Sequence, residues 1–480
     1  MPKEYVDTYF LDSQTALLTA NQNNRVNCTI LVDGLQICYY AGEKLRAAPK
    51  NCIHVPIDKL YKYFGKTKNR LPDDVSYDNT YFTQEERKAL SNKIINIMNS
   101  AIDFRNQLLK KYKKKIKQYK PDFSERPLRV FIPACRETVV MQHTAKSISD
   151  AFIKIGYDVH FHTQKNDMQL CCFVQHVKAL AKYKAHITVN INHLNNDMLH
   201  KDVYNFVWFQ DFMDIVKNPE KKMNLRKRDF IFSLYKDLDY YLDAKNIQYQ
   251  RQSFCVNKKI FFESKTIKRK NKIVFIGHFP NLLREEFKKE NRDIVNLVYS
   301  RLNNKKNTDY STIKFLTQNL NVSPLDMYGQ LGPVIIKYLA VEWLCQVSPI
   351  EIEIYGNDEW AKHDLFKKFY KGHLQYGDEL RKVYNSAKYA LIPTTNYLIM
   401  NRLTEAAACG CIPVVYDCRD NDNPPYFEDD LLYFNDKISL KEALIIEPKG
   451  NPKNVLKGNT FKSFAKKISK IVTKDKSCKN

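Results

Sequence analysis

The sequence AKYALIPTTNYLIMNRLTEAAACGCIPVVYD, residues 387–417, decides the fold class. Its two apolar runs, 389–393 and 412–416, predict buried strands, and the Ala-rich run 401–409 between them predicts a helix. Gly410 follows this helix, as is usual for a left-handed C-terminal cap. Two strands joined by a helix over so short a distance form a βαβ unit, so the sequence predicts a parallel sheet.

The connection between the first strand and the helix carries polar residues that suit a nucleotide diphosphate. It contributes Thr395, and the helix begins with Asn401 and Arg402, with Glu405 one turn further along. Ligands of parallel sheets lie beyond the carboxyl ends of the strands, where a helix N-terminus attracts phosphate. The carboxylate of Glu405 suits the two hydroxyls of a ribose. The alternative is an ordinary Ala-rich packing helix in another doubly wound protein.

The run NRLTEAAACGCIPVVYD, residues 401–417, resembles the donor-binding segment of GT-B fold glycosyltransferases of the group 1 type. It looks closest to the group named after a spore-maturation protein, because Arg402 stands three residues before Glu405 as it does there. The resemblance implies two Rossmann-like doubly wound domains facing a cleft, with the sugar nucleotide held by the second. Retaining relatives carry another Glu eight residues upstream, where this chain has Tyr397. The resemblance leans towards retention, and this departure leaves inversion open.

The chain of 480 residues is long enough for two or three domains. No apolar run reaches the roughly 18 residues of a membrane span. The start, MPKEYVDTYF, lacks a signal-peptide pattern, and the 12 cysteines include no CxxC pair. These features favour a reduced, cytoplasmic protein without a zinc or disulfide framework.

The formal net charge of +24 favours anionic partners such as nucleotide-linked substrates or lipid head groups. A solvated Lys-rich surface explains the charge equally well. Nucleic acid is disfavoured as a partner because the sequence has no zinc-finger spacing, RNP-type strand or Arg-rich recognition helix.

Residues 1–126 form an accessory region outside the resemblance. Residues 26–42 read as a β-hairpin around Asp33-Gly34, and residues 83–120 read as a long helix that starts with a capping box at Thr83. Seven Lys lie between positions 110 and 120. This basic end could contact an anionic membrane, which would place the protein peripherally at the inner membrane face; a solvated helix end is the alternative.

Residues 127–262 read as a Rossmann-like acceptor domain. Its predicted strands are 128–133, 158–162, 186–192, 205–211 and 229–235, and its clearest helices are 144–155 and 173–183. Polar residues gather after these strands, where the resemblance places the acceptor. We single out His143 at a helix start and Asp211 at a strand end as candidate catalytic residues, because an inverting enzyme needs a general base. The alternative for each is a hydrogen-bonded loop residue.

Residues 263–459 read as the nucleotide-sugar domain, and a C-terminal helix at 460–475 could cross back to the first domain. Gly277 and Gly356 each end a predicted strand, and Gly277 would let the backbone approach a phosphate closely. The resemblance implies that Arg284 in the next helix lies near the phosphates and that His373 lies beside the nucleotide base.

The sequence thus predicts a glycosyltransferase that moves a sugar from a nucleotide-diphosphate donor to a cell-surface glycan or protein. Arg402, the backbone at Asn401, and Arg284 would stabilise the leaving diphosphate without a metal or a cofactor. Asp237-Leu238-Asp239 mimics a metal-binding DxD motif, but its flanks predict a helix, so we expect it to lie on the surface. The rivals are a non-catalytic GT-B-like protein that binds a glycan or membrane, and a nucleotide-sugar epimerase.

Overall fold

The structure is a computed structural model, and it forms two compact units. One comprises residues 1–207, 225–229 and 476–480, and the other comprises residues 208–224 and 230–475. The predicted domain boundaries at 126/127 and 262/263 stay predictions. The structure describes residues 16–20, 37–41, 44, 52–72, 74–77, 82–135, 139–165, 173–280, 292–304, 314–315, 317–318, 324–395, 397–422 and 425–474.

The N-terminal region contains a small parallel sheet. Its strands are β1 (Ala16–Ala20), β2 (Ile37–Tyr40), β3 (Cys52–His54) and β4 (Asp74–Tyr77), in the order β3-β2-β1-β4. The predicted hairpin is wrong for β2, because this strand pairs in parallel with both of its neighbours, β1 and β3. The rest of the predicted hairpin lies outside the described residues.

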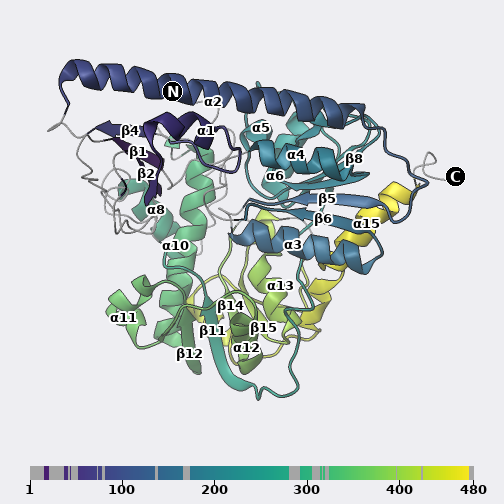
Figure 1. Cartoon of the computed structure of the whole chain (residues 1–480). Helices are drawn as coiled ribbons and strands as arrows, with labels where there is room; N and C mark the ends of the chain where they lie inside the picture. Colours follow the sequence, from purple (N-terminus) through teal and green to yellow (C-terminus); the bar gives the residue numbers. More distant parts are fainter. Residues whose placement is uncertain are drawn as a thin grey trace. The chain divides into compact units, whose positions relative to one another are not determined.

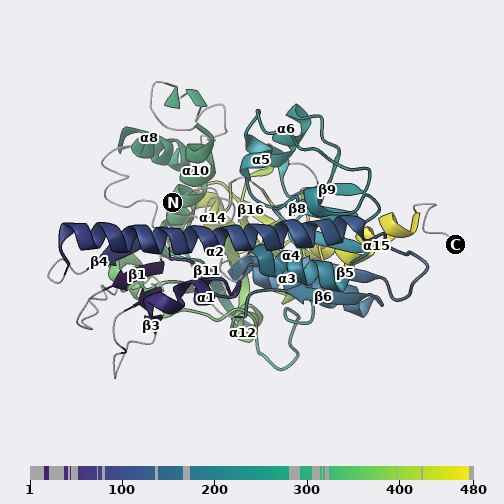
Figure 2. The same ribbon diagram turned by 45° about the horizontal axis from the view of Figure 1, so that its top comes forward.

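Helix α2 (Gln84–Gln118) confirms the predicted long helix and its capping box, in which Thr83 and Glu86 bond to each other's backbone N–H groups. Near its start, Ile94 and Met98 pack in one core with α1 (Leu60–Phe64). Near its end, Ile116 packs with Val177 of α4 (Phe173–Tyr183). The helix therefore runs along both the small sheet and α4, as Figures 1 and 2 show.

The first Rossmann-like sheet has six strands in the order β10-β9-β8-β7-β5-β6. They are β5 (Arg129–Pro133), β6 (Asp158–His162), β7 (Ile187–Ile191), β8 (Tyr204–Phe209), β9 (Asp229–Ser233) and β10 (Tyr249–Arg251). Helix α3 (Val139–Lys154) starts five residues earlier than predicted, because the run VVMQH continues its helical pattern. His143 therefore lies inside this helix rather than at its start.

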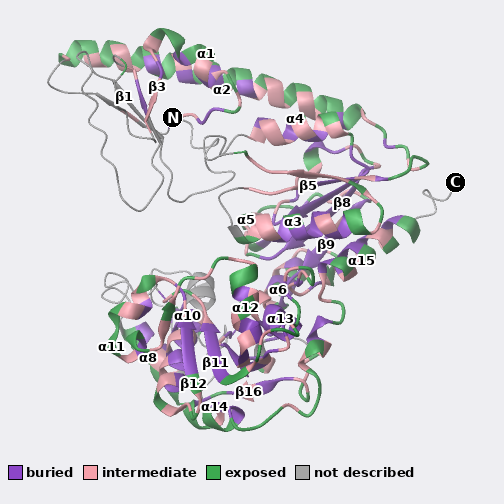
Figure 3. Ribbon diagram, turned by 60° about the horizontal axis from the view of Figure 1, so that its bottom comes forward, coloured by how far each residue is buried: buried purple, intermediate pink, exposed green. Residues whose placement is uncertain are grey.

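The second sheet also has six strands, in the order β13-β12-β11-β14-β15-β16, and each neighbouring pair is parallel. They are β11 (Lys270–Ile276), β12 (Glu351–Tyr355), β13 (Tyr370–Gly372), β14 (Ala387–Ile392), β15 (Ile412–Tyr416) and β16 (Leu432–Phe434). Figure 3 shows β11 and β12 as buried strands. The two parallel sheets confirm the predicted doubly wound fold.

Helices cover both faces of the second sheet. On one face α10 (Pro324–Val347) and α14 (Lys437–Ala443) contribute Leu339 and Leu440 to a core. On the other face α12 (Asp378–Ser386) and α13 (Asn401–Ala408) contribute Leu380 and Ala406. The short strands of this sheet are thus buried on both sides, as a parallel sheet requires.

The remaining elements are mostly single turns and one long C-terminal helix. Within the second unit, α15 (Phe461–Lys474) places Phe464 against Trp208 of β8, with ring centroids 5.0 Å apart, and against Phe232 of β9. The others are η2 (Ile57–Lys59), η4 (Asn196–Met198), α5 (Asp214–Lys217), α6 (Lys236–Ala244), α8 (Arg292–Asn303), η6 (Asp358–Lys362), α11 (Asp364–Lys367), η7 (Arg419–Asn421) and η8 (Pro452–Leu456).

Among the described residues, no helix combines the length and the apolarity that crossing a membrane requires.

Candidate functional site

Four of the predicted site residues come at or shortly after the carboxyl ends of adjacent strands of the second sheet. Gly277 follows β11, Gly356 follows β12, His373 follows β13, and Thr395 comes shortly after β14. Parallel strands end at the same edge of their sheet, so the topology brings these four positions together. This edge is our candidate functional site.

Gly277 and Gly356 lie in two turns that contact each other through their backbones. The N–H of Gly277 donates to the carbonyl of Tyr355 at 2.9 Å, and the indole N–H of Trp360 donates to the carbonyl of Gly277 at 2.8 Å. A Cβ atom on Gly356 would lie 2.1 Å from the carbonyl oxygen of Gly277. The structural reason for glycine at 356 is therefore the close approach of these turns.

Arg402 and Glu405 form an ion pair on the first turn of α13. The Arg402 Nη1 lies 3.0 Å from Glu405 Oε2, and the side chains are 34% and 7% exposed respectively. Burial raises the pKa of Glu405, while the neighbouring guanidinium lowers it. Burial alone would lower the pKa of Arg402, but Glu405 and Tyr384 raise it overall. The pair thus presents the cation towards solvent and keeps the carboxylate beneath it.

Two residues that the sequence reasoning missed, the cation Lys337 and the neutral imidazole of His278, belong to the same electrostatic neighbourhood as Arg402. The pKa of His278 is lowered, first by burial and then by His373, Lys337 and Arg402, so these groups lie within electrostatic reach of His278. The rings of His278 and His373 are stacked, with centroids 6.1 Å apart. Lys337 belongs to α10, and burial lowers its pKa too. The signal for Lys337 was a charge interrupting the apolar run VIIKYLAV, residues 334–341.

The N-terminus of α13 has backbone donors that its own cap does not use. The N-cap residue, Met400, makes no side-chain cap bond, and Thr404 bonds back to the carbonyl of Asn401 at 3.0 Å. Thr395 is 5% exposed, so it lies beneath the surface of the loop. The predicted phosphate contact Arg284 lies outside the described residues.

Asp211 and Tyr397 lie near each other within the second unit. Asp211 is exposed just after β8, and its carboxylate contributes, after burial, to the raised pKa of Tyr397. Tyr397 stacks on Tyr235, with ring centroids 4.9 Å apart. The residue at the position of the relatives' upstream Glu therefore packs against an aromatic ring. His143 belongs to the other unit, where burial lowers its pKa.

The DxD-like carboxylates of α6 are not on the surface, contrary to the prediction. Asp239 is 6% exposed and lies 3.1 Å from Arg251, which also donates to Asp422 at 2.7 Å. Burial raises the pKa of Asp237 and of Asp239 to about 6. Asp239 faces inward because it shares the buried side of this short helix with Leu238 and Leu242, whereas Asp237 is half-buried.

We expect Asp239→Asn to remove a pH dependence of stability. With a folded pKa of about 6 against 3.8 for the free group, the folded state holds this proton more tightly than the unfolded state. The contribution of Asp239 to the free energy of unfolding should therefore fall by about 3 kcal/mol in total as the pH rises from about 3 to about 7, and by about 2 kcal/mol between pH 4.5 and pH 7. Urea unfolding at pH 4.5 and pH 7 measures the difference. Asp243→Asn, exposed on the same helix, is the control, and identical slopes in both variants would contradict the assignment.

Within the described residues, no group of three or more His, Cys, Asp or Glu side chains is arranged to hold a metal ion. The charged groups at the edge of the second sheet are instead cations and one paired carboxylate. Such a set suits an anionic ligand rather than a metal.

Comparison with known proteins gives a family match for one part of the chain. Residues 338–453 match the family described as "Glycosyl transferase-like". This segment contains His373, Thr395, Arg402 and Glu405. The match confirms the predicted resemblance for these residues. No curated protein matches the chain.

Similar solved structures include the following three, each of which shares little sequence identity with this chain. Sucrose-phosphate synthase from Thermosynechococcus elongatus is 12% identical, with a TM-score of 0.45, over 72% of this chain and 98% of that one. A glycosyltransferase from Rickettsia africae is 7% identical, with a TM-score of 0.46, over 73% and 99%. HepE of Anabaena, in complex with UDP and glucose, is 8% identical, with a TM-score of 0.41, over 72% and 100%.

Proposed function

From the premise that residues 338–453 form a glycosyl transferase-like domain and the protein is an enzyme of that class, we propose a specific reaction. The protein transfers a sugar from a nucleotide-diphosphate donor to a glycan or protein acceptor, without a metal ion. The nucleotide-diphosphate donor, the glycan or protein acceptor and the independence from metal ions are all parts of this proposal.

The observation that carries the proposal is the set of cations at the carboxyl edge of the second sheet. Arg402 and Lys337 both lie within electrostatic reach of His278, whose lowered pKa leaves its imidazole neutral at pH 7, and Arg402 belongs to the uncapped first turn of α13. A leaving diphosphate develops negative charge, and prearranged cations and backbone N–H groups stabilise that charge. These groups take the part that a metal plays in other transferases.

Arg402 has the central role in this proposal because Glu405 holds its guanidinium in place. The ion pair leaves about a third of the Arg402 side chain exposed, enough to contact a ligand. A side chain already oriented by a partner loses less entropy when it binds. The carboxylate of Glu405 can also accept hydrogen bonds from the ribose hydroxyls, because the ion pair with Arg402 does not use all of its lone pairs.

We expect Glu405→Gln to weaken the binding of the nucleotide. Glutamine keeps the size of the side chain but loses the charge that orients Arg402 and accepts ribose hydroxyls. A charge-assisted hydrogen bond contributes about 1.5–3 kcal/mol, so the dissociation constant should rise by about one to two orders of magnitude. Isothermal titration calorimetry with UDP, GDP and ADP measures it. An unchanged affinity for the nucleotide that binds best would reject the role of Glu405.

Metal removal should leave the reaction intact. We expect turnover with excess EDTA to equal turnover with added Mg²⁺ or Mn²⁺, because the cations of the protein neutralise the diphosphate. The transfer rate of radiolabelled sugar measures this. A rate that disappears in EDTA and returns with a divalent ion would refute metal independence.

A thermal-shift panel of nucleotides and nucleotide sugars is the first test of the proposal as a whole. A ligand present at 100 times its dissociation constant stabilises the folded state by about 2.7 kcal/mol. We expect one sugar nucleotide to raise the melting temperature and its sugar to be released or transferred. Conversion of the donor into its epimer without an acceptor would favour the epimerase instead, and binding without turnover would favour a non-catalytic protein.

A further inference from the structure

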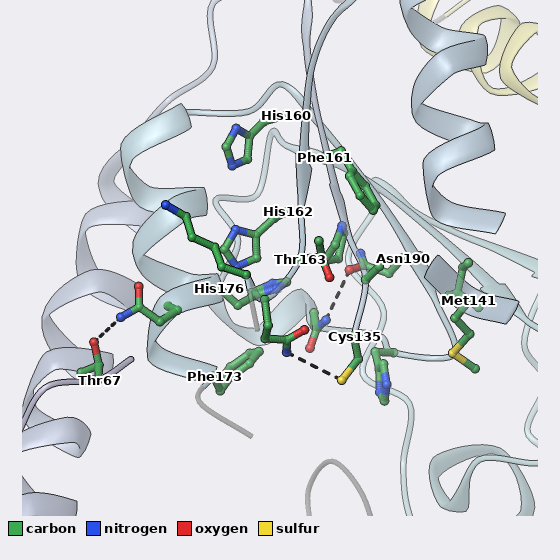
Figure 4. A pocket seen from close by; sticks show the side chains of 18 of the residues that line it. Thr67, Cys135, Met141, His160, Phe161, His162, Thr163, Phe173, His176 and Asn190 are labelled. Atoms are coloured by element: carbon green, nitrogen blue, oxygen red, sulfur yellow. Dashed lines mark hydrogen bonds between the residues drawn. The ribbon is translucent and has the colours of Figure 1, made fainter. Parts of the chain in front are cut away.

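The first compact unit contains a cavity of about 670 Å³ (Figure 4). It lies where β5, β6 and β7 end, and its walls include Cys135, Thr163 and His193 from the connections after these strands. Residues 66–68 of the N-terminal region complete the wall. A volume of this size is typical of a small-molecule site. The N-terminal region therefore forms part of the wall of this cavity.

Imidazole and aromatic rings form one side of the cavity. His160 and His162 alternate along β6 and stack on Phe131, and His176 of α4 meets Phe131 edge-on with ring centroids 5.3 Å apart. Figure 4 shows the three imidazoles together, with Phe173 beside them. Burial lowers the pKa of His162 to about 4 and of His176 to about 3. At neutral pH these rings are uncharged, so each offers one donor and one acceptor.

Further polar groups face the same space from the other side. The hydroxyl of Thr163 is buried and has no hydrogen-bond partner within the protein. Asn195 donates to Asn190 at 3.3 Å, which orients both amides at the end of β7. Rings together with neutral donors and acceptors suit the apolar faces and hydroxyls of a sugar.

The charged residues of the cavity are all basic. Lys66, Lys68 and Lys165 line it, and no described residue of the lining is an Asp or a Glu. The described lining thus carries more positive than negative charge, which favours an anionic group on the ligand.

The loop with the two N-terminal lysines is held in place by buried bonds. Arg105 of α2 is 2% exposed and donates to the carbonyls of Phe64 at 2.8 Å and Asn69 at 2.6 Å. The side chain of Thr67 accepts a hydrogen bond from Gln175 of α4. These bonds tie residues 64–69 to both α2 and α4. Lys66 and Lys68 are thus positioned over the cavity by the fold.

We propose that this cavity binds an acidic sugar as the acceptor, and that Lys66 and Lys68 select it by contacting its carboxylate or phosphate. The N-terminal region thereby acts as the element that sets acceptor specificity. The role of the bound sugar as acceptor rests on the proposed transferase function. The binding of an acidic sugar in this cavity does not depend on that function.

Calorimetry without any nucleotide tests the proposal. The probes are glucose, glucuronate and glucose 6-phosphate, which share a ring and differ in having no charge, a carboxylate or a phosphate. The variants are K66E/K68E and, as a matched control, K59E/K62E. Lys59 and Lys62 are exposed lysines of the same region that do not line the cavity, so both variants change the net charge equally.

We expect at least one acidic probe to bind about tenfold or more tightly than glucose, and K66E/K68E to remove that difference. The K59E/K62E variant should bind like the wild type. Equal affinity for glucose and both acidic probes would overturn the inference, as would an equal loss in the two variants. Whichever acidic probe binds more tightly shows whether the site prefers a carboxylate or a phosphate.

Titration with UDP, GDP and ADP in parallel separates this inference from the proposed function. A protein that binds a nucleotide but neither acidic probe refutes the acidic-sugar site and leaves the transferase intact. A protein that binds an acidic probe through Lys66 and Lys68 but no nucleotide supports the site and refutes the donor assignment.

Discussion

Arg402→Ala is expected to slow sugar transfer about 100-fold. Removing one charge-assisted contact to a developing anion costs about 2–4 kcal/mol of transition-state stabilisation. The kcat for transfer from the nucleotide sugar is the measured quantity, because the contact strengthens as the diphosphate leaves. The KM for the donor should change less than kcat.

The ion pair with Glu405 requires a second variant. Alanine at 402 leaves a carboxylate that is 7% exposed without its partner, which lowers stability. The double variant R402A/E405Q removes that penalty and should recover the melting temperature but not the rate. Lys382→Ala, which removes an exposed cation from neighbouring α12, is the control for net charge. Wild-type turnover in R402A/E405Q would show that Arg402 does not contact the diphosphate.

Gly356→Ala is expected to lower both stability and nucleotide affinity. The new Cβ would lie 2.1 Å from the Gly277 carbonyl oxygen and 2.9 Å from Trp360 Nε1, and backbone cannot move aside as a side chain can. Overpacking of this kind costs about 1–3 kcal/mol, a fall of roughly 3–10 °C in melting temperature. The turn that carries His278 would shift with it. Thermal unfolding and nucleotide titration measure the two effects.

Gly458→Ala is the control that separates the loss of stability from the loss of nucleotide affinity. At Gly458 a Cβ meets no atom within 4 Å, but the backbone has φ +79°, so alanine is strained there without a clash. This variant should lose stability and keep its nucleotide affinity. If Gly356→Ala behaves in the same way, the turns at Gly277 and Gly356 do not shape the nucleotide site.

Local pattern sufficed for most of the elements of the two large sheets. The predicted ranges of β6, β15 and α4 agree with the structure, because apolar periodicity and flanking turn residues act over a few residues. The same patterns identified the strand ends that hold Gly277 and Gly356, whereas His373 was proposed from the resemblance. These candidates follow from topology, since parallel strands end at one edge.

Pairing and burial were harder to predict, because they depend on partners far away in the sequence. The Asp33-Gly34 signal suggested a hairpin, but β2 lies in parallel between β1 and β3. Asp239 sits in a helix, as predicted, but Arg251 and the surrounding protein bury it. A local sequence pattern predicts neither the pairing of β2 nor the burial of Asp239.

The sequence by itself determined the doubly wound fold, the capped long helix and the Arg402–Glu405 spacing, because each depends on residues within one or two turns or strands. Only the tertiary structure placed both Lys337 and Arg402 within electrostatic reach of His278, and only it combined Lys66 with the histidines of β6 and α4 around one cavity. The physical reason is that charge and cavity shape arise where distant segments pack together, and packing is a property of the whole fold.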